Sequence, residues 1–185
     1  MEVAFDLALE DLLAFHEYHN AHSPTMQRHY HLAWWRFPVA VIVLWLILAA
    51  WSGQFSQFAW DYWYALLIVP FWLFWFPWRW HRRQRKNALR LLNEGENVGI
   101  LGRQRITITP ETVTQSNAYR EYRTRWEAVE KIVRSEHYAY IYVSAYTAHI
   151  LPRRAFLTDG EFLKFVGEAL HYHDAKRRAQ QQPGV

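Results

Sequence analysis

The sequence predicts an α+β membrane protein in which a transmembrane helical hairpin carries a small β-barrel closed by one helix. Three observations predict this class. Two apolar runs lie between Leu32 and Trp80, a burst of basic residues follows the second run, and short alternating segments fill the chain from Val98 onward. At 185 residues the chain has room for the hairpin and one modest soluble domain.

Composition supports a membrane location once it is examined in local windows. The mean hydropathy of −0.26 averages an apolar middle with polar flanks. Ten of the eleven tryptophans lie between residues 34 and 80, and tryptophan favours the membrane interface. The chain has no cysteine, which excludes disulfides and cysteine-ligated metals. The net charge of +4 is concentrated beside the hairpin, so we expect no nucleic-acid binding.

Residues 1–31 are expected to form a cytoplasmic strand and helix. Val3 to Leu7 alternates as a strand does, Leu9 to Ala21 has helical spacing, and Ser23-Pro24 ends the helix. Its histidines, His16, His19 and His22, recur every third residue. They could converge on a metal, but the spacing departs from His-Glu-x-x-His, so a polar helix face is favoured and no metal site is predicted.

Residues 32–80 are expected to form the hairpin, with spans at about 32–51 and 58–78. Some twenty residues at about 1.5 Å each cross the roughly 30 Å hydrocarbon core. The first span has one charge, Arg36, which can reach the near interface, and the second has Asp61 near its beginning. Pro70 lies in the middle of the second span and is expected to kink it. A soluble helical hairpin is the alternative, but a chain this short could not cover so much aromatic surface.

Charge asymmetry predicts the orientation of the hairpin. The turn between the spans has no Lys or Arg, whereas a basic cluster follows the second span, so both termini should be cytoplasmic. A basic juxtamembrane helix is expected over 81–97, with its end near Gly95. The cluster sets topology, and it is also the candidate contact for anionic lipid. Its members are Arg79, Arg82, Arg83, Arg85, Lys86 and Arg90.

Residues 98–173 are expected to form six or seven strands followed by a helix. Arg105–Thr109 and Thr112–Ser116 alternate on either side of Pro110-Glu111, and further strands follow a short helical turn at 126–130. Thr158-x-x-Glu161 is a capping box that begins the last helix. This order best fits a small barrel of the pleckstrin-homology-like type. Residues 174–185 are basic and rich in Gln, and we expect a disordered tail.

A tyrosine row is the candidate partner surface of this domain. Tyr138, Tyr140 and Tyr142 share one face of a strand, while Ala139, Ile141 and Val143 share the other. If the aliphatic face is the core, the tyrosines point outward, where they could contact a partner or the membrane interface. A cross-strand ladder is the simpler alternative.

Several segments, taken in order, resemble the bacterial YcxB-like membrane proteins. They are Phe5-x-Leu-x-Leu-Glu-Asp11, the two-span hairpin, Ile106-Thr-Ile-Thr-Pro-Glu111, Trp126-x-x-Val129-x-x-Ile132, Tyr138-x-Tyr140-Ile-Tyr142 and Ile150-Leu-Pro-Arg-Arg-Ala-Phe156. The resemblance implies a multi-pass protein of the bacterial inner membrane whose C-terminal domain is similar to bacterial pleckstrin-homology-like domains. It brings no catalytic residues.

The function expected from the sequence is therefore a non-enzymatic membrane module. The hairpin would tether a cytoplasmic interaction domain, a scaffold or regulatory subunit that binds another protein or its own copy. Recognition of anionic lipid at the inner leaflet is the first alternative, and a subunit of a transport or enzyme complex is the second. We predict no catalytic residues, no cofactor and no metal ligands. The expected partners are the lipid bilayer and a protein.

Overall fold

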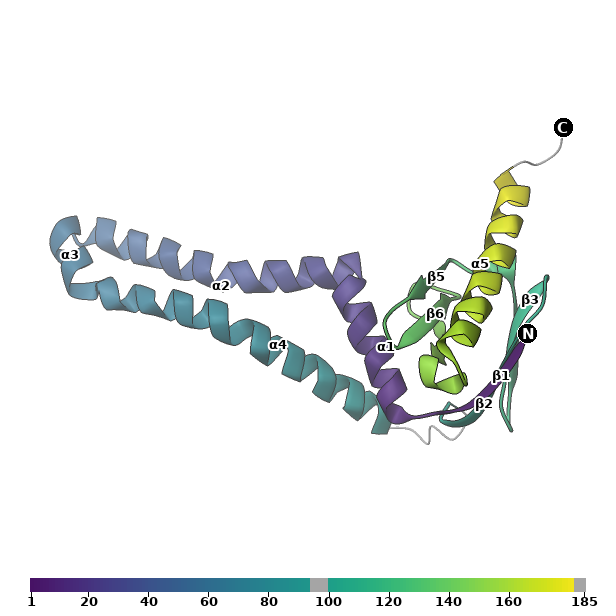
Figure 1. Cartoon of the computed structure of the whole chain (residues 1–185). Coiled ribbons are helices and arrows are strands. Elements are labelled where there is room, and N and C mark those ends of the chain that lie inside the picture. Colours follow the sequence, from purple (N-terminus) through teal and green to yellow (C-terminus); the bar gives the residue numbers. More distant parts are fainter. Residues whose placement is uncertain (94–99, 182–185) are drawn as a thin grey trace. The chain divides into compact units, whose positions relative to one another are not determined.

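The structure, a computed structural model, describes residues 1–93 and 100–181, and it divides into two compact units. Unit 1 combines residues 1–16 with the chain from residue 92 onward, and unit 2 comprises residues 17–91. Figure 1 shows the helices of unit 2 and the sheets of unit 1. The predicted helix end near Gly95, the start of the domain at Val98 and the tail residues 182–185 lie outside the described residues.

Unit 1 is built from seven strands in two antiparallel sheets. The first sheet has the order β1-β2-β3-β4 and the second has the order β5-β6-β7. The strands are β1 (Glu2–Leu7), β2 (Gly102–Ile108), β3 (Thr112–Ser116), β4 (Glu121–Arg125), β5 (Lys131–Arg134), β6 (Tyr138–Tyr142) and β7 (Ala148–Pro152). The strands expected from the sequence are thus present, and a 3₁₀ turn at Trp126–Ala128 occupies the predicted helical turn.

The N-terminal strand β1 belongs to the first sheet. It pairs with β2 along its whole length, from Glu2 opposite Thr107 to Leu7 opposite Gly102. Alternation explains the pairing, because Val3, Phe5 and Leu7 are buried while the residues between them are exposed. The first and last parts of the chain therefore fold as one unit, although residues 17–91 separate them in the sequence.

The predicted closed barrel is wrong. No ladder joins the two sheets among the described strands, so both sheets are open. Between β4 and β5 the chain turns through Trp126, whose side chain is fully buried and whose indole N–H donates to the Thr109 carbonyl at 2.8 Å. A large side chain in this corner replaces the backbone pairing that would close a barrel.

The last helix, α5 (Asp159–Gln181), covers the open corner next to Trp126 and β5. The Thr158 half of the predicted capping box is present, since the Glu161 N–H donates to Thr158 Oγ1 at 3.2 Å, while the Glu161 carboxylate accepts from the Leu157 N–H at 3.2 Å. Phe156 packs against Phe162 and Phe165 of α5. The predicted tail from residue 174 is wrong as far as Gln181, because the helix continues there through residues with good helix propensity.

A chain of polar side chains crosses the interior of unit 1. His149 of β7 donates through Nδ1 to Gln115 Oε1 at 2.5 Å, Gln115 donates to Gln104 at 3.2 Å, and Gln104 donates to the Ile100 carbonyl at 2.9 Å. The bond between Gln115 and His149 links the two sheets. His149 is 6% exposed, and its Nε2 has no partner among the described protein groups.

Unit 2 is a helical hairpin whose two legs lie side by side in Figure 1. The helix α1 (Leu9–His22) leads into it from unit 1, and α2 (Pro24–Trp51) forms the first leg. The return leg consists of α3 (Phe55–Tyr62), a 3₁₀ segment at Trp63–Leu67 and α4 (Ile68–Asn93). The tip contains Gly53, whose φ of +69° favours glycine.

Pro70 does not kink the middle of a helix, contrary to expectation. It is the third residue of α4, where its missing N–H has no intrahelical partner to lose. The break falls before it instead, at Trp63–Leu67. The predicted second span, 58–78, is therefore a succession of three helical pieces rather than one helix.

Candidate lipid-binding surface on the hairpin

An aromatic seam holds the two legs of the hairpin together. The Phe37 and Trp72 rings lie 4.3 Å apart, and Tyr30 of α2 packs against Phe76 and Trp80 of α4. The Trp72 indole N–H donates to the Trp34 carbonyl at 3.2 Å. On α4 the seam residues 72, 76 and 80 are four apart, so they share one helix face.

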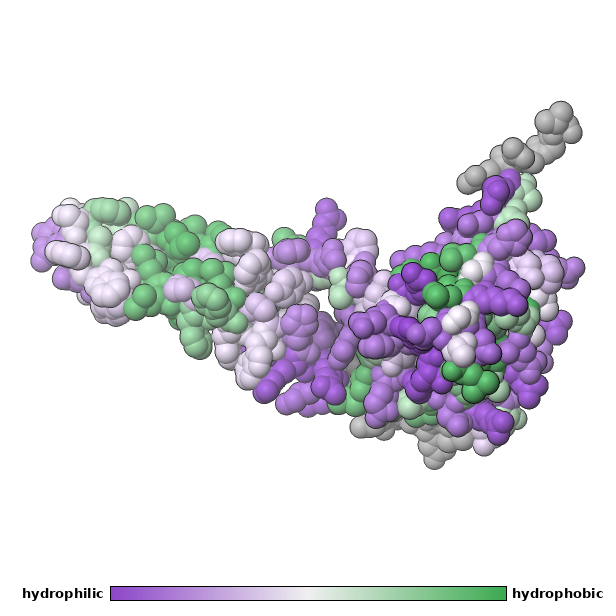
Figure 2. All heavy atoms as spheres, viewed as in Figure 1, coloured by the Kyte–Doolittle hydropathy of each residue, from purple (hydrophilic) through white to green (hydrophobic). Residues whose placement is uncertain are grey.

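The faces of the hairpin that lie opposite the aromatic seam expose large apolar side chains. Leu44 and Ile47 of α2 are each 58% exposed, and Phe74 of α4 is 84% exposed. Figure 2 shows this apolar surface as a green band over the hairpin, with paler side chains on either side of it. One helix among the described residues, α2, is long and apolar enough to cross a membrane. An exposed apolar surface of this kind indicates contact with a membrane or another protein.

Most of the predicted basic cluster gathers on one face of α4. Its members at positions 79, 82, 83, 86 and 90 follow the i, i+3, i+4, i+7, i+11 spacing of a single helical face. They line one hollow of about 550 Å³. We call these five residues, Arg79, Arg82, Arg83, Lys86 and Arg90, the basic stripe. Arg85, the sixth predicted residue, does not line the hollow.

Aromatic rings hold two guanidinium groups of the basic stripe. Arg82 lies 3.9 Å from the centre of the Trp78 ring, and Arg79 lies 4.7 Å from that of Trp75. No described carboxylate lies within ion-pair distance of any stripe residue. The stripe therefore presents uncompensated positive charge beside an apolar, aromatic surface, which is the arrangement that anionic amphiphiles complement.

The predicted outward tyrosine row is wrong. Tyr140 and Tyr142 are 1% and 2% exposed, and Tyr138 is half-buried. The aliphatic face of β6 is buried as expected, but α1 covers the tyrosine face as well. Phe15 of α1 packs on Tyr140 and Tyr142, with ring centres 5.4 and 5.7 Å apart. Tyr140 and Tyr142 are core residues, so the row does not form an outward partner surface.

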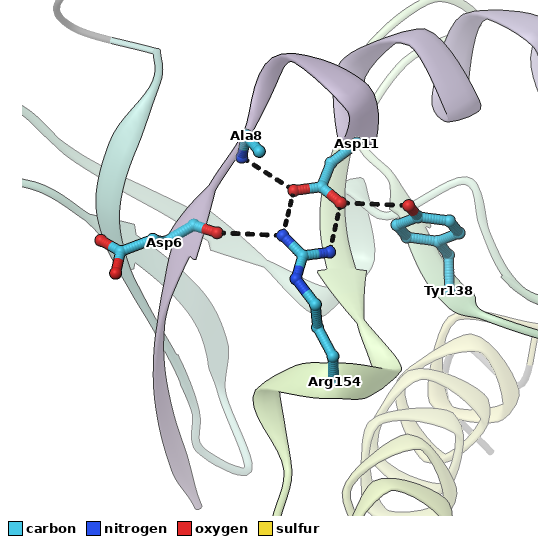
Figure 3. Close-up of polar contacts among 5 residues, drawn as sticks. All are labelled: Asp6, Ala8, Asp11, Tyr138 and Arg154. Carbon is cyan, nitrogen blue, oxygen red and sulfur yellow. Dashed lines mark hydrogen bonds and ion pairs between the residues drawn. The ribbon is translucent and has the colours of Figure 1, made fainter.

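A buried carboxylate joins α1 to the turn after β7. It is not among the site residues predicted from the sequence. Asp11 is 1% exposed and accepts two hydrogen bonds from the Arg154 guanidinium at 2.5 and 2.6 Å (Figure 3). It also accepts from the Tyr138 hydroxyl at 3.0 Å and from the Ala8 N–H at 2.8 Å. Both partners of the ion pair occur in segments that carry the family resemblance, but 143 residues separate them.

These contacts determine the ionisation of Asp11. Burial by itself raises the pKa of the carboxyl, but the hydrogen bonds from Arg154, Ala8 and Tyr138 outweigh burial and hold its pKa below the usual range. Burial and the bond to Asp11 raise the pKa of Tyr138. The cluster is a lock between the first and last parts of unit 1, because Arg154 also donates to the Asp6 carbonyl at 3.2 Å.

The histidines of α1 do not assemble a metal site within the described residues, where no group of three candidate ligands converges. The His22 ring instead stacks on Tyr18 at 4.1 Å, and its Nδ1 lies 2.9 Å from the Tyr18 carbonyl. The spacing of three residues turns successive imidazoles around the helix, which separates them.

One comparison with known proteins finds a match to a family model. Residues 108–167, from the end of β2 into α5, match the family described as YcxB-like protein. No curated protein matches, and no solved structure matches. The match covers the strands β3 to β7 and the first turns of α5, which form the greater part of unit 1. Residues 108–167 of this chain are therefore similar to the YcxB-like family, as the sequence resemblance predicted.

Proposed function

We propose that the chain is a multi-pass protein of the bacterial inner membrane that holds its YcxB-like domain at the cytoplasmic surface. In this proposal the hairpin of unit 2 spans the bilayer, and the basic stripe lies among the headgroups and binds anionic lipid. The domain itself acts by recognition rather than catalysis. The observation that carries the proposal is the pairing of β1, which precedes the hairpin in the sequence, with β2, which follows it.

This pairing constrains the topology of any membrane insertion. β1 precedes the hairpin and β2 follows it, yet the two strands share six register pairs in one sheet. A folded sheet lies on one side of a bilayer, so both ends of the hairpin must emerge on that side. An even number of crossings follows, which supports two spans even though the second leg is interrupted at 63–67.

The distribution of charge supports a cytoplasmic location for that side. The stripe and Arg85 lie on the side where the hairpin joins unit 1, whereas the tip from Ser52 to Gln57 carries no Lys or Arg. Cytoplasmic flanks of membrane helices are enriched in these residues. Each Lys or Arg near an anionic leaflet adds about 1 kcal/mol of attraction.

We further propose that unit 1 has a pleckstrin-homology-like arrangement. Seven antiparallel strands in two open sheets, followed by a helix that covers one corner, support this assignment. The burial of Tyr140 and Tyr142 removes the surface on which binding of a protein partner was expected. The uncompensated charge of the stripe favours lipid as the ligand instead.

Alkaline extraction of membranes tests the anchoring. We expect the full chain to stay in the membrane pellet at alkaline pH, as integral proteins do. A variant with Leu44→Arg and Ile47→Arg should move to the supernatant or fail to accumulate, because charges at a span centre oppose insertion. The matched control, Ser52→Arg and Gln54→Arg at the tip, should stay in the pellet. Extraction of the unaltered chain would contradict the proposal.

A further inference from the structure

We propose that the basic stripe and an adjoining aromatic hollow form a site for a phospholipid that carries two phosphates, of the cardiolipin class. This inference rests on the proposed membrane location and specifies the ligand. The observation behind it is that two hollows on α4, one cationic and one apolar, share the side chains of Arg79 and Arg83.

The apolar hollow lies on the part of α4 nearer the tip. It has a volume of about 290 Å³ and is lined by the aromatic residues Trp72, Trp75, Phe76 and Trp80, together with Arg79 and Arg83. Three of these aromatics also form the seam with α2, so the walls are held by packing. A rigid aromatic hollow that ends at two guanidinium groups matches a molecule with an apolar chain and an anionic head.

The cationic hollow is large enough for more than one phosphate. Its volume is about 550 Å³, and its five cations have no described carboxylate partner. The α-helical rise places Arg83 about 6 Å and Lys86 about 10 Å beyond Arg79 along the axis. One phosphodiester would engage only part of this length, whereas two phosphates of one lipid can engage both ends. Guanidinium forks bind phosphate with two parallel hydrogen bonds, which favours arginine at such positions.

A ring contact holds Arg79, one of the two arginines at the boundary between the hollows. Arg79 lies over Trp75, which itself lines the apolar hollow, so the first cation is positioned where an acyl chain would meet its headgroup. A soluble polyanion would use the stripe but would gain nothing from the aromatic hollow. The two hollows together therefore indicate a lipid rather than free diphosphate.

Native mass spectrometry of the full chain in detergent tests the inference. Protein is titrated with cardiolipin and, separately, with phosphatidylglycerol at equal phosphate concentration. We expect cardiolipin to bind about tenfold more tightly. Arg83→Gln should weaken cardiolipin binding about fivefold, the effect of one lost cation. Arg85→Gln removes the same charge next to the site but outside it, and should change binding less than twofold.

A second variant tests the apolar hollow. Trp75→Ala should reduce the preference for cardiolipin over free diphosphate, because only the lipid uses the aromatic hollow. Equal binding of the two lipids, equal effects of Arg83→Gln and Arg85→Gln, or displacement of cardiolipin by an equal concentration of free diphosphate would each overturn the inference. Such results, obtained on protein that stays in the alkaline membrane pellet, would leave the proposed anchoring intact. Loss of the protein from the pellet would overturn both.

Discussion

At the scale of single residues, Asp11 is the side chain on which the joining of the two chain ends depends. A carboxylate that is almost fully buried is costly unless every lone pair finds a donor. Here the Arg154 fork, the Tyr138 hydroxyl and the Ala8 N–H supply four hydrogen bonds. The bond to Ala8 also satisfies a free N–H at the start of α1, so one side chain caps the helix and locks it to the domain.

Replacement of Asp11 should loosen the N-terminal segment. Asp11→Asn keeps the shape of the side chain but removes the charge to which Arg154 and Tyr138 donate. We expect the free energy of unfolding of unit 1 to fall by about 2 kcal/mol. Hydrogen exchange, read by mass spectrometry on peptides from residues 2–15, should accelerate. Asp6→Asn is the matched control, because Asp6 contributes only its main-chain carbonyl and its carboxylate points away from the cluster (Figure 3). Unchanged exchange in Asp11→Asn would refute the lock.

The same lock should respond to acid. Because the folded-state pKa of Asp11 lies below the unfolded value, the carboxylate stabilises unit 1 fully above about pH 4, the ordinary range of aspartate. That stability is lost as the pH falls through the lowered pKa. Amide exchange of residues 2–15, corrected for the intrinsic pH dependence of exchange, should therefore show a steep step below about pH 4 in the unaltered chain. In Asp11→Asn this step should be absent.

His149 gives unit 1 a second dependence on pH, in a higher pH range. Burial lowers the pKa of its imidazole from 6.5 to about 4, so the unfolded chain takes up a proton more readily between these values. Stability is complete above about pH 6.5 and falls as the pH drops toward 4, by up to roughly 3 kcal/mol. Thermal unfolding of unit 1 at pH 7.5, 5.5 and 4.5 should follow this slope, and His149→Gln should flatten it. An identical slope in the variant would exclude His149 as the cause.

At the scale of elements, α1 acts as a cover for the second sheet. It places Phe15 on Tyr140 and Tyr142, so β6 is buried on both faces. A strand that is buried on both faces has no outward side for a partner, and this explains why alternation alone misjudged the tyrosines. Two contacts hold α1 in place: the strand before it, β1, pairs with β2, and its own Asp11 binds Arg154.

Truncation of Phe15 should expose this second face. Phe15→Ala removes a buried ring and is expected to destabilise unit 1 by about 3 kcal/mol. Amide exchange in β6 and β7 should increase more than in β2 and β3, because the lost packing is local to the second sheet. Glu10→Ala, an exposed position on the same helix, should leave exchange unchanged. Equal protection of β6 in Phe15→Ala and the unaltered chain would show that α1 does not stabilise the sheet.

At the scale of the whole molecule, the hairpin is an insertion into a single folded unit. β1 and α1 precede the hairpin in the sequence, and β2, which follows the hairpin, pairs with β1 in the same sheet. In the proposed topology, two spans inserted in this way would keep both flanks on one side of a bilayer and would require no long connection on the other. The short connection between α2 and α3, residues 52–54, agrees with that arrangement.

Local patterns in the sequence predicted much of this molecule. Period-two alternation located the strands, the capping box at Thr158 located the last helix, and the run of basic residues located the cluster to which the stripe belongs. Tertiary pairings were not predictable in the same way. Nothing local reveals that Val3 pairs with Ile106, that Asp11 meets Arg154, or that Trp126 fills a corner a barrel would close. Helical periodicity alone is enough to predict that the stripe residues share one helix face. The same periodicity separates Arg85 from them.

Single-cysteine labelling tests the central claim that the hairpin spans the membrane with unit 1 in the cytoplasm. The chain has no native cysteine, so each introduced thiol reports one position. Ser56→Cys lies at the exposed tip and Ala118→Cys in the exposed turn between β3 and β4. With a membrane-impermeant maleimide on intact spheroplasts, we predict labelling of Ser56→Cys, and of Ala118→Cys only after permeabilisation. Labelling of Ala118→Cys in intact spheroplasts, or protection of Ser56→Cys, would contradict the account.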